Sequence, residues 1–287
     1  MVDIIHGATG AQGSPVLSAL TAAGRTAIAA VRHPEAVPDG IAARQVDLAS
    51  ADSLASAYEG ADGVFVHLPM GAPEATAAQA RAVVEAVDRT RPGRVVISTS
   101  GQIVDRPDSP LQATAGSPIM TLIDGVTGSG IPTAVVAPRL YLENLLLPVV
   151  LAPAHQEGVL RYPLPASFPV SWSSHLDVAD VVARLLMDTS VSGTVAVGHR
   201  PGLTGADLAA AFSNHLGREV HFEAITPEAF GALITPLFGP AAAPVVELYR
   251  ALNAQDGCII AEDSSAQELL GLRPRPIEQW LKDLAVS

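Results

Sequence analysis

The chain has 287 residues, of which 48% are hydrophobic and 16% charged, so it can bury a sizeable core and is not a disordered protein. Its formal net charge of −12 argues against nucleic acid and anionic membranes as partners, because phosphate binding needs clustered Lys and Arg side chains. The single cysteine, Cys258, excludes a disulfide framework and a metal site built from several thiolates.

The first half of the chain alternates short apolar runs with helical patterns, which indicates a parallel sheet covered by helices on both faces. The six predicted strands are Val2–His6, Thr26–Val31, Ala43–Val46, Gly63–His67, Arg94–Ser98 and Thr133–Ala137. Helices are predicted at Ser14–Ala23, Asp52–Tyr58 and Pro73–Thr90, and either Ser50 or Asp52 is expected to cap the second. Six strands with crossover helices are typical of a doubly wound α/β sheet.

Beyond residue 138 the alternation of strands and helices ends, and prolines divide the chain into short segments. Those prolines lie at positions 138, 148, 153, 163, 165 and 169. A helix is predicted over Thr204–Leu216, with Thr204 as its N-cap and Gly217 directly after its last turn. The stretch Pro274–Leu284 predicts a final helix that begins after Pro276. We expect this part to cap one edge of the sheet rather than to form an independent domain.

Neither a signal peptide nor a membrane helix is predicted. The apolar run Val2–His6 is too short and follows no charged region, and Leu145–Ala152 is also short and contains prolines. A cytoplasmic protein that does not enter a membrane is therefore expected.

A glycine-rich loop lies directly between the first predicted strand and the first predicted helix. Gly7 permits a tight turn, Gly10 lets the backbone approach a pyrophosphate, and Gly13 lets helix and strand pack closely. The following helix presents free N–H groups and a positive dipole end to the phosphates. This context predicts a Rossmann-type dinucleotide site. Its expected contacts are Gly7, Thr9, Gly10, Ala11, Gln12 and Gly13.

The residue after the second predicted strand indicates which dinucleotide binds. NAD-selective sites place an acidic side chain here to bind the ribose 2′-hydroxyl. This chain has Arg32, whose guanidinium suits the oxygens of a 2′-phosphate, so NADP(H) is the expected cofactor. The neighbouring His33 is expected to lie beside the adenine.

Further candidates follow the third, fourth and fifth predicted strands, because the carboxyl ends of parallel strands line the ligand crevice. Asp47 is expected to reach the adenine amino group. The remaining candidates are Leu48, Leu68, Pro69, Ser98, Thr99 and Ser100.

These features together resemble a known family, the NmrA-like group of atypical short-chain dehydrogenases. That group includes redox-sensing regulators, quinone reductases and triphenylmethane-dye reductases. The matching segments span nearly the whole chain: Gly7–Gly13, Arg32, Gly130–Thr133, Pro138 with Asn144, Ser171–Asp180 and Leu270–Pro274. The resemblance implies a Rossmann-type doubly wound parallel sheet with a smaller C-terminal α/β substrate-binding cap. We expect residues 1–150 to bind NADP(H) and residues 151–287 to form the cap, packed together as a single compact unit.

The chain departs from short-chain dehydrogenases in the Tyr-x-x-x-Lys pair that usually lowers the pKa of the catalytic tyrosine. Placing Asp124 at the family's acidic position puts Gly116 at the tyrosine and Met120 at the lysine. Lys282 is the only lysine in the sequence and lies far outside this segment. The sequence therefore predicts that any catalysis proceeds without a Tyr-Lys dyad.

Three other residues are the candidates for a catalytic role, since the resemblance implies that their segments bound the substrate pocket. They are Tyr141, Asn144 and His175. A histidine can act as acid or base near neutral pH. The eight histidines show no metal-ligand spacing, so no metal site is expected.

The leading hypothesis is an NADPH-dependent oxidoreductase that reduces a small, largely apolar acceptor such as a quinone, an enone or an imine. Hydride transfer is the cofactor's chemistry, and the protein has chiefly to position and polarise the acceptor. Two alternatives remain open at this point: a non-catalytic NADP(H)-binding redox sensor, and a tailoring cyclase or isomerase on the same fold. Both a monomer and a homodimer are compatible with the sequence.

Overall fold

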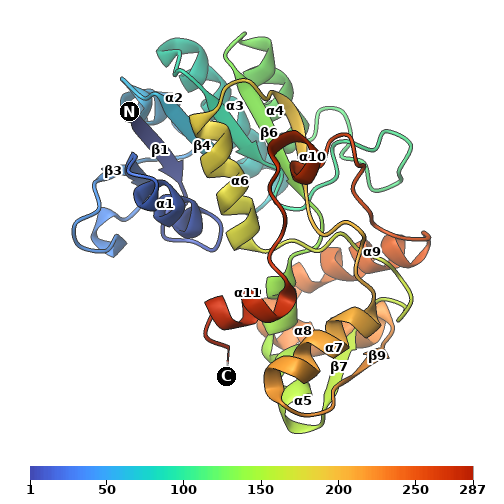
Figure 1. Ribbon diagram of the computed structural model, residues 1–287. Coiled ribbons are helices and arrows are strands. Elements are labelled where there is room, and N and C mark those ends of the chain that lie inside the picture. The colour runs from blue at the N-terminus through green and yellow to red at the C-terminus, as the bar shows by residue number, and fades with distance from the viewer. Residues whose placement is uncertain (287) are drawn as a thin grey trace.

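A parallel sheet of seven strands forms the larger of two lobes in the computed structural model, which describes residues 1–286 (Figure 1). In spatial order the strands are β3 (Ala43–Gln45), β2 (Thr26–Val31), β1 (Val2–His6), β4 (Gly63–His67), β5 (Val95–Ser98), β6 (Thr133–Pro138) and β8 (Gly193–Val197). The strand order reverses between β1 and β4, which is where ligands bind in sheets of this kind. The predicted doubly wound α/β sheet is confirmed.

Five helices cover the two faces of this sheet. Helices α2 (Ala51–Tyr58), α3 (Pro73–Thr90) and α4 (Pro118–Gly128) cover one face, and α1 (Gly13–Ala22) and α6 (His175–Met187) cover the other. Because successive strand residues point to opposite faces, Ile4 packs under α2 and α3 while Ile5 packs under α1 and α6. Both side chains are fully buried, as expected for a sheet covered on both sides.

Helix α6 and strand β8 return to the larger lobe late in the chain. Strand β8 pairs in parallel with β6, and α6 packs beside α1 (Figure 1). Residues 175–197 thus lie in the sheet layer, although the expected boundary at residue 150 assigned them to the cap. The seventh strand was not predicted, although Thr194, Val195 and Val197 are β-branched residues typical of strands.

The smaller lobe is an α/β cap with its own apolar core. It contains α5 (Pro148–Gln156), β7 (Val159–Tyr162), α7 (Gly205–Leu216), β9 (His221–Ala224), α8 (Pro227–Phe238), α9 (Ala242–Asn253) and α11 (Ile277–Asp283). Strands β7 and β9 pair in parallel, and Tyr162 packs edge-on against Trp172 with ring centroids 5.5 Å apart. Short connecting helices are η1 (Pro34–Ala36), η2 (Leu142–Leu146), η3 (Gly239–Ala241) and α10 (Ala266–Leu270).

Several helix ends lie where the sequence predicts them. Of the two candidate caps of α2, Ser50 is the N-cap, and its side chain accepts a hydrogen bond from the Ser53 N–H at 3.2 Å. Thr204 begins α7, and Gly217 ends it in the left-handed conformation with φ of 63°. Helix α11 begins directly after Pro276.

One helical stretch in the described residues, Pro227–Asn253, is long and apolar enough to cross a membrane by length and composition. It is not straight: the chain turns at η3, and Gly231 of α8 packs against Val246 of α9. Each arm has 12 residues and is therefore about 18 Å long, which is shorter than the roughly 30 Å of a bilayer core. The two arms form a helical hairpin in the cap.

Candidate functional site

A cavity of about 490 Å³ opens at the carboxyl ends of β1, β2, β3 and β4, beside the strand reversal. Its walls come from the first 79 residues alone. They are His6, Gly7, Thr9, Gly10, Ala30, Val31, Arg32, Val46, Asp47, Leu48, His67, Pro69, Met70 and Gln79. We call it the nucleotide cavity.

Two glycines of the glycine-rich loop have no room for side chains: Gly7, which lines the nucleotide cavity, and Gly13, which lies behind it at the start of α1. A Cβ on Gly13 would lie 2.3 Å from the Gly7 carbonyl oxygen and 2.5 Å from that of His6. Gly7 has a φ of +60°, and a Cβ there would lie 2.5 Å from Nε2 of His67. The loop therefore lies tightly against β1, and α1 starts at Gly13. This arrangement of loop and helix N-terminus is the one that binds a dinucleotide pyrophosphate.

Seven of the expected cofactor residues line the nucleotide cavity and several others do not. Gly7, Thr9, Gly10, Arg32, Asp47, Leu48 and Pro69 line the nucleotide cavity. Leu68, Ser98 and Thr99 are buried, and Ala11 is exposed. His33 does not line the cavity, and its Nδ1 lies 3.0 Å from a carboxylate oxygen of the exposed Glu35.

His67 and Gln79 also line the nucleotide cavity; the strand end at His67 was among the expected sites, whereas Gln79 was not anticipated from the sequence. His67 packs against Gly7, and burial lowers the pKa of its imidazole. Gln79 of α3 has a buried Oε1 atom with no hydrogen-bond partner among the described residues. Gln79 lies on the face of α3 that the apolar periodicity predicts to pack inside the protein. The periodicity alone therefore does not identify it as a cavity residue.

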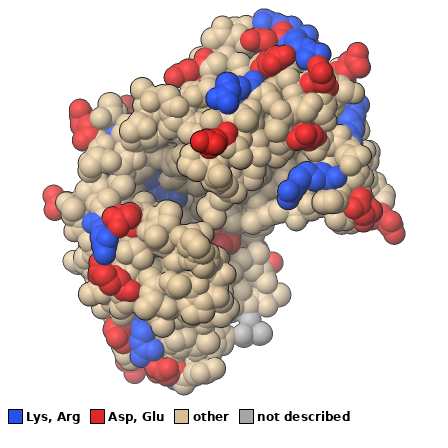
Figure 2. Space-filling model, turned by 180° about the vertical axis from the view of Figure 1, so that it is seen from behind, with Lys and Arg blue, Asp and Glu red and all other residues tan. Residues whose placement is uncertain are grey.

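A second cavity of about 540 Å³ lies between the larger lobe and the α8–α9 hairpin. Viewed from behind, the surface of the molecule is hollowed between its two lobes (Figure 2). The wall is mostly apolar and comes from segments far apart in the chain, including Ile103, Leu111, Leu147, Phe230, Ile234, Val245 and Leu252. Its polar lining includes Gln12, Ser100, Tyr141, Asn144 and Tyr249. We call it the acceptor cavity.

Gln12 connects the glycine-rich loop to the acceptor cavity. Its Oε1 atom accepts hydrogen bonds from the hydroxyls of Ser98 at 2.8 Å and Tyr141 at 3.3 Å. Its Nε2 atom donates to Ser100 Oγ at 3.0 Å. Ser100 follows the end of β5 in the left-handed conformation, with φ of 55°. Strained backbone of this kind concentrates at functional sites, and here it turns the chain toward the cavity.

Tyr141 and His175 form a stacked pair, with ring centroids 4.4 Å apart and planes inclined by 46°. Only Tyr141 lines the acceptor cavity. Burial raises the pKa of the Tyr141 phenol and lowers the pKa of His175 to about 4. Both side chains are therefore neutral at physiological pH.

Glu143 anchors the helix that carries His175. Its Oε1 atom accepts hydrogen bonds from the His175 backbone N–H at 3.0 Å and from Nε1 of Trp280 at 3.2 Å. Burial raises the pKa of the Glu143 carboxyl. The same oxygen lies 3.8 Å from His175 Nδ1. Glu143 thus joins η2, α6 and α11 behind the Tyr141–His175 pair.

The third catalytic candidate, Asn144, lines the acceptor cavity together with Tyr249. Tyr249 hydrogen-bonds Tyr162 hydroxyl to hydroxyl, and burial raises the pKa of both phenols. These groups place hydrogen-bonding side chains on an otherwise apolar wall.

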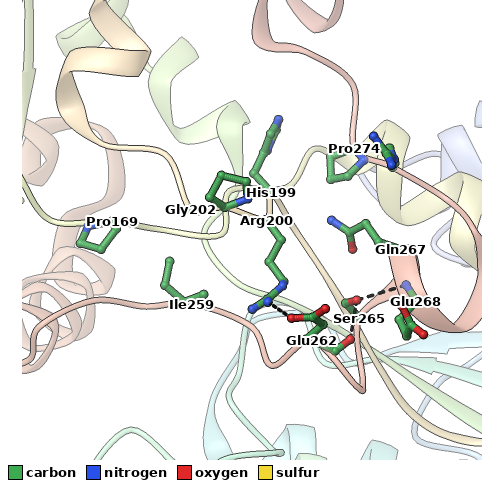
Figure 3. Close-up of a pocket in the computed structure, with 12 residues that line it drawn as sticks. Pro169, His199, Arg200, Gly202, Ile259, Glu262, Ser265, Gln267, Glu268 and Pro274 are labelled. Atoms are coloured by element: carbon green, nitrogen blue, oxygen red, sulfur yellow. Dashed lines mark hydrogen bonds and ion pairs between the residues drawn. The ribbon is translucent and has the colours of Figure 1, made fainter.

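A third cavity, of about 860 Å³, shares no lining residue with these two and lies after β8 and beside α10 (Figure 3). Its charged side chains include Arg200 and Glu262, which form an ion pair with each other. Ser265 is engaged as the N-cap of α10 and accepts a hydrogen bond from the Glu268 N–H at 3.2 Å. This cavity has no connection to the glycine-rich loop, and size alone is not evidence of function.

Residues 3–281 match the model of the NmrA-like family. The chain belongs to the NmrA-like family. The resemblance derived from the glycine-rich loop and the later segments is thereby confirmed. Gly116 and Met120, the residues expected at the positions of the usual dyad, lie ahead of α4 and within it.

Similar proteins agree with this assignment. An NAD(P)H azoreductase from Xenophilus azovorans is 30% identical over 230 residues, which cover 78% of this chain and 77% of that protein. The structure of triphenylmethane reductase from Citrobacter sp., complexed with NADP(H), superposes with a TM-score of 0.81 at 19% identity and covers 99% of each chain. An NADPH-dependent quinone oxidoreductase from Escherichia coli, complexed with NADPH, has a TM-score of 0.78 at 19% identity, covering 99% of this chain and 100% of that one. The two structural matches show the shared fold.

Proposed function

We propose that this NmrA-like protein is an NADPH-dependent reductase of a small, largely apolar acceptor, for which a quinone is the leading candidate and an enone or imine the next. The observation that carries the proposal is the position of Gln12, which belongs to the dinucleotide loop and yet lines the acceptor cavity. A cofactor on the loop and an acceptor in that cavity would meet beside Gln12, Ser100 and Tyr141.

The nucleotide cavity fits NADP(H) in shape and charge. Gly7 and Gly10 line the cavity without side chains, which suits a pyrophosphate, and Arg32 supplies a cation for the 2′-phosphate. The names of the azoreductase, the dye reductase and the quinone oxidoreductase support the same cofactor class. Asp47 and Gln79 are the polar groups we assign to the adenine end.

Bound NADPH supplies a hydride equivalent, and a proton from solvent completes the two-electron reduction of a quinone to its hydroquinone. The protein's own contribution is to exclude water with the apolar wall and to orient the acceptor oxygen. Because its pKa is raised, the Tyr141 phenol stays protonated and donates a hydrogen bond to that oxygen in place of its bond to Gln12. This role needs no neighbouring lysine.

We infer that His175 positions Tyr141 rather than acting on the acceptor. It stacks against the phenol ring and does not line the acceptor cavity. Asn144 does line that cavity, so we assign it a hydrogen bond to the acceptor at a second point.

The variant Tyr141→Phe tests the role of the phenol. Loss of one hydrogen bond to the acceptor predicts that kcat/KM for 2-methyl-1,4-naphthoquinone falls by about 3- to 15-fold. The dissociation constant of NADPH is expected to stay unchanged. A fall beyond about 100-fold would mean that the phenol transfers a proton and would contradict the hydrogen-bonding role.

The reductase proposal itself fails if the wild-type protein binds NADPH but oxidises it with no quinone, enone or imine. If NADPH and NADP⁺ then differ at least ten-fold in affinity and only one form captures a partner protein, the redox sensor is the better account. Loss of nicotinamide absorbance and calorimetric titration of both cofactor forms provide the two measurements.

A further inference from the structure

The α8–α9 hairpin has an apolar surface that packing inside the lobe does not explain. Phe230, Ile234 and Phe238 recur every four residues on α8 and line the acceptor cavity, as an amphipathic helix requires. Leu233 and Leu237 lie on a neighbouring stripe of the same helix and are 41% and 48% exposed. An ordinary surface helix carries polar residues at such positions.

This exposed surface is continuous with the acceptor cavity. Phe238 and Leu248 line the cavity and are nevertheless 42% and 38% exposed, so they form its rim. The stretch 229–246, which includes the turn at η3, contains no charged residue. The charged side chains of the hairpin pair with one another: Arg250 lies 2.7 Å from Glu228 and 2.5 Å from Glu247. Figure 2 likewise shows a broad face without charges on the lower lobe.

We propose that the natural acceptor carries an alkyl or isoprenoid chain, which leaves the acceptor cavity over Phe238 and Leu248 and lies against Leu237. This inference rests on the proposed reductase function and names the substrate class of the same site. A molecule that occupies both the acceptor cavity and its rim must be elongated, and it must be apolar because both the cavity and the exposed surface beyond the rim are apolar.

Other occupants of the surface fit less well. Helices that lie on membranes are usually rich in Lys and Arg on their polar face, whereas the hairpin has one arginine and the chain a net charge of −12. A second copy of the chain seated on Phe238 and Leu248 would cover the rim through which an acceptor enters.

The test is the rate of NADPH oxidation with 1,4-naphthoquinones that carry a methyl, propyl, pentyl or heptyl group at C2. These alkyl groups alter ring reactivity little, so differences in kcat/KM report contacts of the chain. A fully buried methylene contributes up to about four-fold. For partial burial we expect a rise of at least about ten-fold from methyl to heptyl.

The variant Leu237→Asp is expected to remove most of this rise, because it places a charge where the chain would lie. Leu269→Asp is the matched control, since Leu269 is a 36% exposed leucine on α10, away from the hairpin, and it should leave the rise intact. Sedimentation velocity and co-sedimentation with phosphatidylcholine vesicles complete the experiment.

Equal kcat/KM across the series overturns the inference and leaves the reductase function standing, because the methyl compound is still reduced. Vesicle binding or dimerisation that Leu237→Asp abolishes, without any dependence on chain length, assigns the surface to a bilayer or a second copy and also overturns it. If no quinone, enone or imine oxidises bound NADPH, the reductase function and this inference fail together.

Discussion

The nucleotide and acceptor cavities are of similar size and share Met70 in their linings, but they are built in opposite ways. The nucleotide cavity is made by residues 6–79, at strand ends that neighbour one another in the sheet. The acceptor cavity takes its wall from residues as distant as Gln12 and Cys258. The first therefore depends on local backbone geometry, and the second on how the cap packs against the sheet.

This difference implies different sensitivities to mutation. A site defined by backbone approach has little tolerance for added atoms, because carbonyl oxygens cannot move aside without moving β1 or α1. A site defined by apolar side chains tolerates replacements that keep the volume. Family members can thus keep one cofactor site while their acceptors differ.

The largest expected effect is at Gly13, where an added side chain meets the backbone of Gly7 and His6. We expect Gly13→Val to weaken NADPH binding by about 100-fold or more, since overpacking against backbone costs on the order of 3 kcal/mol. Calorimetric titration measures the binding, and circular dichroism checks that the variant is folded.

Gly128→Ala is the control for Gly13→Val, because Gly128 is exposed at the end of α4 and an added Cβ meets nothing there. It should leave the affinity unchanged. Wild-type affinity in Gly13→Val would show that the loop is looser than its contacts indicate and would remove the contrast between the two cavities.

An intermediate effect on NADPH affinity is expected at Arg32, whose side chain we assign to selection between NADPH and NADH. Loss of a charge-assisted hydrogen bond to the 2′-phosphate predicts that Arg32→Ala binds NADPH about 10- to 100-fold more weakly. NADH binding should not change. Arg184→Ala, at an exposed arginine of α6, serves as the control. An unaltered NADPH-to-NADH ratio in Arg32→Ala would mean that another group selects the cofactor.

The sequence predicts the locally built nucleotide cavity better than it predicts the acceptor cavity. The glycine spacing, six of the seven strands and the caps at Ser50, Thr204 and Gly217 are local signals, and the structure contains each of them. Local patterns suffice there because the relevant contacts span only a few residues. The family resemblance added the segments that were expected to bound the substrate pocket.

The acceptor cavity shows what such patterns miss. The resemblance pointed to Tyr141, Asn144 and His175, and only the first two line the cavity. His175 begins α6, and its ring packs against Tyr141, a tertiary contact between residues far apart in the chain that no local pattern shows. Phe230 and Tyr249 have no sequence signal that distinguishes them from core aromatics.

The smallest expected effect concerns His175, which lies behind the acceptor cavity. Burial lowers its pKa from 6.5 to about 4. Between these values the unfolded chain binds a proton that the folded chain does not, so this histidine makes the protein less stable as the pH falls below 6.5. From pH 7 to 5.5 its contribution to the free energy of unfolding falls by about 1 kcal/mol.

Thermal unfolding of His175→Gln at pH 7 and 5.5 measures this contribution. The loss of melting temperature between the two pH values should be about 2–4 °C smaller than in the wild type, whereas His33→Gln, at an exposed histidine, should match the wild type. An equal loss in His175→Gln and wild type would mean that the folded protein protonates His175 by pH 5.5. The imidazolium, 3.8 Å from Glu143, would then be a charged group directly behind Tyr141. His175 would become a source of protons for the acceptor, and the positioning role assigned to it would be wrong.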